Sequence, residues 1–291
     1  MDQAGRPQTP RVVATAAIAL GLSGYLAASE LRLAALFIVG MLLGMTLYHS
    51  SFSFSGAYRR LLLHGEVRAI RAQMIMLAVA TLAFAPLLAA GQFGGRALGG
   101  AYAPVGVAMV FGAFVFGIGM QLASGCGSGT LCAAGGGSPR MLLVLAAFCG
   151  GGFLASLDLG AWQSLPEWPP VVFGERFGWG VAASLQAALL GAAAWSLRRR
   201  DHSAPAATFH LWRGPWPLLA GALLLALFNL ATLLLAGHPW TITWGFTLWG
   251  AKVSQLLGWN PAGSAFWSQP FQRSALDSGI LADVTSIMDI G

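Results

Sequence analysis

The sequence predicts an all-α, polytopic membrane protein with broken or half-penetrating helices. Two features of its composition support this class: 56% of the 291 residues are hydrophobic, and only 9% are charged. Soluble domains carry about 25% charged residues, so too few polar side chains remain here to cover a soluble surface. The third observation is a glycine-rich interruption between apolar stretches, which is typical of an unwound segment within a membrane protein.

Eight apolar segments are the candidates for membrane helices. The first follows Arg6 and Arg11, as in a signal peptide. Its apolar run is long for a signal peptide, and a second apolar run follows after a few residues, so we expect a retained first helix. The segments cover residues 11–28, 33–49, 70–90, 103–122, 140–158, 177–197, 215–236 and 241–257.

The polar connections predict how the chain crosses the membrane. Residues 49–66 (HSSFSFSGAYRRLLLHGE) are too polar to span, and we expect either a short half-inserted hairpin or an ordinary loop there. Basic residues mark cytoplasmic loops, whereas the acidic connection from Asp158 to Glu175 contains no Lys or Arg and suits the outer side. This pattern predicts a cytoplasmic N-terminus in a bacterial inner membrane. The basic residues are Arg59, Arg60, Arg68 and Arg71 in one loop, and Arg198, Arg199 and Arg200 in another.

The same loops account for the net charge of +6. No stripe of Lys and Arg alternates with exposed aromatic residues, so we do not expect a nucleic-acid partner. The cysteines and histidines lack metal-ligand spacing, and no phosphate-binding glycine loop is present. We therefore expect no metal, no cofactor and no ATP site on this chain.

A weak internal repeat predicts two related halves, as in many transporters. Residues 11–66 and 215–280 each contain two apolar segments followed by an aromatic-rich, arginine-bearing amphipathic segment. The predicted division is a first membrane repeat over 1–200, a cytoplasmic linker over 201–214 and the start of a second repeat over 215–291. We expect this second repeat to be incomplete, with its remainder either missing from this chain or carried by another.

The interruption covers residues 117–138 and reads GIGMQLASGCGSGTLCAAGGGS. Glycine in a helix interior costs about 1 kcal/mol relative to alanine, and the alternation at Gly125, Gly127 and Gly129 favours an unwound backbone. A half-helix that starts near Ser128 would direct free N–H groups and its positive dipole end at the break, which attracts anions. No carboxylate lies between Gly91 and Leu157 to repel one. The other interpretation is that these glycines only allow close helix packing.

Two of the three cysteines lie in this stretch. Cys126 stands at the break, where we expect a protonated thiol that donates weak hydrogen bonds to a soft anion. Cys132 lies six residues further on, and we expect it on a different face of the second half-helix. Cys149 is interpreted as a small buried hydrophobic residue. Ser124, Ser128 and Thr130 either bond the local backbone or contact a ligand.

These motifs resemble the YeeE/YedE family of membrane proteins, which carry a sulphur-transport domain. The resemblance lies in GMQLASGCGSGTLCAAGGGS and in two flanking motifs, HSSFSFSGAYRRLLLHGE and FWSQPFQRSALDSGILADVTSIMDIG. It implies a bacterial inner-membrane protein with two related halves, incompletely penetrating helices and thiosulfate uptake. It also implies, for some members, selenium metabolism or a small cytoplasmic sulfur-carrier protein as partner. The central cysteine of the family maps onto Cys126, whereas its cysteine in the first flanking motif corresponds to Ser53 here.

The sequence therefore predicts a non-enzymatic carrier of thiosulfate or a related sulfur oxyanion across the lipid bilayer. The predicted pathway residues are Ser53, Gly125, Cys126, Gly127, Ser128 and Cys132. One alternative is a membrane sulfurtransferase, or a sulfur- or selenium-carrier subunit, that uses Cys126 as a persulfide, which requires an activated thiolate. A second alternative is an assembly subunit that transports nothing.

Overall fold

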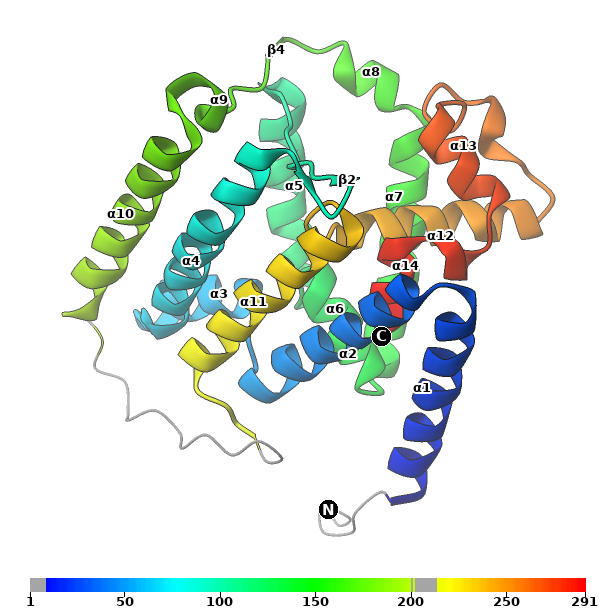
Figure 1. The fold of residues 1–291 in the computed structure, drawn as a ribbon, viewed down its shortest axis with the longest axis horizontal. Helices are drawn as coiled ribbons and strands as arrows, with labels where there is room; N and C mark the ends of the chain where they lie inside the picture. The colour runs from blue at the N-terminus through cyan, green and yellow to red at the C-terminus, as the bar shows by residue number, and fades with distance from the viewer. Residues whose placement is uncertain (1–8, 200, 202–213) are drawn as a thin grey trace.

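The computed structural model describes residues 9–199, 201 and 214–291, and the fold is almost entirely helical (Figure 1). Among the described residues, seven stretches are long and apolar enough to cross a membrane, so this is a multi-pass membrane protein. They are α1 (Thr9–Ser29), α2 (Leu31–Ser50) together with α3 (Phe54–His64), α4 (Arg68–Ala90), α5 (Val107–Ala123) together with α6 (Gly127–Gly135), α7 (Pro139–Leu157), α10 (Trp179–Arg198) and α11 (Leu218–Ala236).

The prediction of an eighth span over 241–257 is wrong. This segment forms a helix, α12 (Ile242–Leu256), but its 15 residues are too few for a span, which needs about 20. Figure 1 shows α12 crossing the direction of α7. Shorter elements follow it: η1 (Pro261–Gly263), α13 (Pro270–Asp277), η2 (Ile280–Ala282) and α14 (Val284–Ile290).

The polar stretch 49–66 is not an ordinary loop, because most of it forms the helix α3 (Phe54–His64). Ser53 supplies the N-cap, which satisfies an amide that the first helical turn leaves free. The helix is amphipathic: Ala57 is buried, whereas Leu62 is 83% exposed.

Two ends of the molecule are distinguished by their charge. An ion pair between Arg71 and Asp201 joins the start of α4 to the residues after α10, so both arginine-rich regions lie on one side. The acidic connection lies at the other end of α10 (Figure 1). Residue 200 and residues 202–213 of the predicted linker lie outside the described residues. The short elements at the acidic end are β1 (Gln92–Phe93), β2 (Arg96–Ala97), β3 (Val105–Gly106), α8 (Leu159–Gln163), β4 (Glu167–Trp168) and α9 (Phe173–Phe177).

The main core surrounds α2, which packs against α1, α11 and α14. Its leucines Leu36 and Leu43 are fully buried, as is Leu233 of α11. A smaller core around Trp267 and Leu248 joins α12 and α13 to α7. By contrast, α5 buries none of its residues against the described chain. Much of its surface is therefore free for lipid or another partner.

Candidate anion site at a helix break

The predicted break is present between α5 and α6. Helix α5 ends at Ala123, Ser124 adopts a left-handed conformation with φ of 62°, and α6 begins at Gly127 with Cys126 as its N-cap. The start of α6 agrees with the predicted position near Ser128 to within one residue. No side chain caps α6, so no side chain satisfies its first N–H groups at the positive end of the helix dipole.

Gly125 is needed where the chain turns into α6. A Cβ at this position would lie 3.0 Å from the hydroxyl oxygen of Thr130 and 3.3 Å from its backbone nitrogen. The Thr130 side chain is fully buried, and its hydroxyl has no hydrogen-bond partner among the residues that the structure describes. An unpaired buried hydroxyl is costly, and here it faces the space that glycine leaves open.

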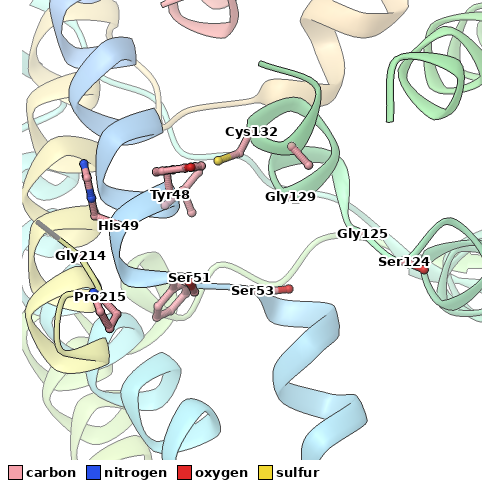
Figure 2. A pocket seen from close by; sticks show the side chains of 13 residues that line it. Tyr48, His49, Ser51, Ser53, Ser124, Gly125, Gly129, Cys132, Gly214 and Pro215 are labelled. Atoms are coloured by element: carbon pink, nitrogen blue, oxygen red, sulfur yellow. The ribbon is translucent and has the colours of Figure 1, made fainter. Parts of the chain in front are cut away.

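A cavity of about 660 Å³ opens beside the break, between the end of α2 and the start of α6 (Figure 2). Its walls bring together segments that are far apart in the sequence. None of the described lining residues carries a carboxylate. The lining consists of Leu47, Tyr48, His49, Ser51, Phe52, Ser53, Ser124, Gly125, Gly129, Cys132, Ala133, Gly214 and Pro215.

Ser53 has both a structural role and a free hydrogen-bonding capacity. Its hydroxyl oxygen accepts a bond from the Gly56 amide at 3.0 Å and lies 3.2 Å from the hydroxyl of Ser55. When Ser55 donates in that pair, the Ser53 hydrogen is free to donate into the cavity. The buried Gln73 of α4 donates to the Ser53 carbonyl oxygen at 3.3 Å and fixes this turn.

The two cysteines of the break occupy different places. The half-buried Cys126 is not among the cavity-lining residues, and its sulfur lies 3.5 Å from the Ser128 hydroxyl. Cys132 lines the cavity, and its thiol contacts the Gly44 carbonyl oxygen of α2 at 3.9 Å. Figure 2 shows the Cys132 sulfur directed toward Tyr48.

The structure thus brings three of the predicted pathway residues into one cavity: Ser53, Gly125 and Cys132. The other three, Cys126, Gly127 and Ser128, form the N-cap and first turn of α6. A Cβ on Gly127 would lie 3.5 Å from Ile242 and 3.6 Å from Phe246, so the start of α12 covers this turn.

Sequence reasoning missed three side chains that shape the site. Tyr48 and His49 line the cavity, and the His49 ring stacks on Trp216 with centroids 5.0 Å apart. The only available signal was their position beside the polar stretch. Arg140, at the start of α7, donates to the Ser124 hydroxyl at 3.4 Å and to the Leu122 carbonyl oxygen at 3.5 Å. It places a cation against the cavity wall.

Comparison with known proteins agrees with these features. The profile of a family described as sulphur transport matches residues 49–286, which include most of the cavity lining, the first flanking motif and most of the second. No curated protein sequence matches the chain at a significant level. The family match covers most of the chain, and the sulphur-transport resemblance of the motifs is confirmed. The chain is a multi-pass membrane protein that belongs to the sulphur-transport family.

Proposed function

We propose that this protein carries thiosulfate, or a closely related sulfur oxyanion, inward across a bacterial inner membrane. One observation carries the proposal. The uncapped N-terminus of α6 lies beside a cavity that is lined by hydroxyl and thiol groups and free of carboxylates along its described wall. Such a site attracts an anion through partial charges and neutral hydrogen-bond donors, without an ion pair to a Lys or Arg side chain among the described lining residues.

The attraction comes from the backbone and from a cation at the edge of the site. The first amides of α6, including those of Gly127 and Ser128, provide positive potential at the break. Arg140 adds a charge next to Ser124. The guanidinium of Arg140 lies at the cavity wall and not at its centre, so it attracts the anion only moderately. Transport requires such moderate binding, because the ion must also be released.

Neutral donors then complete the pathway. Ser53 and Cys132 both line the cavity, and Cys126 stands at the adjoining helix break. A thiol is a weak, polarizable donor, so it suits the soft sulfur atom of thiosulfate and releases it readily. In this proposal the ion meets Ser53 and Cys132 in the cavity and Cys126 at the break.

The proposed architecture consists of two related halves, residues 1–200 and 215–291, joined by the 201–214 linker. In this proposal the order α1, α2, α3 of the first half corresponds to α11, α12, α13 of the second, and the shared feature that supports it is a short helix, α3 or α13, after a longer one. The proposed orientation puts the arginine-rich side in the cytoplasm. A small cytoplasmic sulfur-carrier protein is a proposed partner on that side.

The experiment compares Cys126→Ala with Cys149→Ala in proteoliposomes that take up radiolabelled thiosulfate. Cys149 is the matched control, because it is also a half-buried thiol but lies on α7, away from the cavity. We expect Cys126→Ala to lower the uptake rate about tenfold, the effect of losing one hydrogen bond to a charged group, and Cys149→Ala to leave it nearly unchanged. Equal rates for the two variants would contradict the proposed role of Cys126.

Mass spectrometry of the intact protein after incubation with thiosulfate tests the sulfurtransferase alternative. We expect no persulfide on Cys126, since a carrier that passes the ion by hydrogen bonds forms no covalent bond. A persulfide that is lost in Cys126→Ala would favour the enzyme instead.

A further inference from the structure

A second unusual polar group lies away from the cavity, on α14. Asp289 is only 5% exposed and is enclosed where α14 packs against α2 and α12. One carboxyl oxygen, Oδ1, accepts a hydrogen bond from the Trp240 indole at 2.8 Å. The other, Oδ2, is buried and has no hydrogen-bond partner within the described part of the chain. A polar atom left in this state needs either a ligand or a proton.

The neighbouring charges do not neutralise this carboxyl. The titratable groups that act on it are Asp283, at the start of α14, and the Cys149 thiol of α7. The cations of the elements packed against α14 are engaged elsewhere: Lys252 of α12 donates to the carbonyl oxygens of Leu276 and Ser278, and Arg32 of α2 pairs with Glu30.

An ionised carboxylate without a cation is very costly in such surroundings, whereas a carboxylic acid is not. A proton on Oδ2 therefore accounts for both observations: the burial of the group and its missing partner.

Helix α12 connects this carboxyl to the break. A Cβ on Gly245 would collide with Oδ2 of Asp289, so the carboxyl lies directly on the α12 backbone. The neighbouring residue, Phe246, faces the other way and contacts Gly127 in the first turn of α6. Asp289 and the break are therefore separated by the width of one short helix.

We propose that Asp289 is a proton-binding site that couples proton entry to the passage of the anion. This inference rests on the proposed function. A divalent anion that moves into a negative interior is opposed by the membrane potential, and an accompanying proton offsets part of its charge. Oδ2 takes the proton from the outer side and releases it to the cytoplasm, so each cycle that uses this site moves one proton with one dianion.

The change of charge would act through α12. Ionised Asp289 leaves an unpaired charge against Gly245, and the start of α12 shifts away from it. Protonation restores the close contact and returns Phe246 to the first turn of α6. The residues that cover the break thus respond to the proton.

The first experiment measures thiosulfate uptake into proteoliposomes with the membrane potential clamped at zero and the interior made alkaline. Asp289→Asn is the test variant because the amide keeps the shape of the side chain and the acceptor for Trp240. Asp283→Asn is the control, since it removes the neighbouring carboxylate of α14 while its amide oxygen keeps one of the two bonds that Asp283 accepts, either from the Ser286 amide or from the Trp244 indole. We expect the pH gradient to stimulate uptake about tenfold in the wild type and Asp283→Asn, and to have no effect in Asp289→Asn.

The second experiment detects the proton without transport. Infrared spectra are recorded in lipid nanodiscs at neutral pH, and the spectrum of each variant is subtracted from that of the wild type. The wild-type spectrum should contain a protonated-carboxyl band that is absent in Asp289→Asn and present in Asp283→Asn. Absence of this band in the wild type would overturn the proposal, and so would equal stimulation of Asp289→Asn and the wild type by the gradient. If the wild type takes up no thiosulfate at all, the proposed function fails, and the infrared band alone decides whether Asp289 binds a proton.

Discussion

Two of the cavities that the described residues form along the broken helix α5–α6 differ more in chemistry than in size. The cavity beside the break has a volume of about 660 Å³ and is lined by hydroxyl, thiol and imidazole groups. The other, between α5, α7 and α12, has about 860 Å³ and is lined mainly by apolar side chains and glycines, with Thr243 and Thr247 as its hydroxyls.

This difference in lining shows that the volume of a cavity does not identify it as an anion site in a membrane protein. An anion needs donors and positive potential to replace its hydration. Of these two cavities, the first combines hydroxyl and thiol groups with Arg140 at its wall. The second cavity has an apolar lining, which suits a lipid acyl chain or another apolar surface. The following substitutions test whether the rate of transport depends on the hydrogen-bond donors of the polar cavity or on the volume of the apolar cavity.

The largest effect is expected from a carboxylate placed in the polar cavity. Ser124→Asp and Ser124→Asn are a matched pair, because both side chains tolerate the left-handed conformation of this position. The new carboxylate should pair with Arg140 and cancel the positive charge at the wall, which lowers the rate of thiosulfate uptake about a hundredfold, or roughly 2.7 kcal/mol. Ser124→Asn should stay within about threefold of the wild type. Similar rates for the two variants would show that the ion does not pass Ser124.

An intermediate effect is expected at Ser53. Ser53→Ala removes one donor to the anion, and uptake should fall about tenfold. It also removes the N-cap of α3, which costs about 1 kcal/mol of stability, so the comparison needs Ser53→Thr, which retains both the hydroxyl and the cap. We expect Ser53→Thr to transport at a rate close to the wild type and to unfold at the same temperature. If Ser53→Thr loses as much uptake as Ser53→Ala, the hydroxyl is not the relevant group.

The smallest effect is expected in the apolar cavity. Gly112 lines it, and a Cβ at this position would meet nothing within 4 Å. Gly112→Leu should therefore fill part of this cavity and leave uptake unchanged to within about twofold, while helix propensity favours the variant by about 1 kcal/mol. Uptake and thermal unfolding in detergent are the two measurements. A large loss of uptake would mean that the ion or a moving helix needs the apolar space.

Much of the site was predictable because its main feature is local. Each of the glycines at 125, 127 and 129 weakens a helix by about 1 kcal/mol relative to alanine. Their alternation predicted a break near this point, although Gly127 and Gly129 themselves belong to α6. The partners of the break are not local. Cys132 and Ser53 line the same cavity only because α6 packs beside the end of α2, and no sequence pattern encodes that approach.

The second half shows the same limit more strongly. The apolar run at 241–257 predicts a spanning helix by composition, yet α12 has only 15 residues and lies across the fold. Its indoles bond the polar residues that follow η2: Trp244 pairs with Asp283, and Trp249 with Ser286 at 3.0 Å. These pairs link residues nearly forty positions apart, which only the folded chain brings together.

The sequence by itself determined the membrane class, the position of the helix break and the absence of carboxylates around it. These properties depend on hydropathy, glycine spacing and charge, which act over one or two helical turns. The tertiary structure decided which thiol reaches the cavity, which arginine supports its wall and which carboxyl is sealed without a cation. The reason is that a broken helix changes direction at a few backbone dihedral angles, and packing against α2, α7 and α12 selects among those directions.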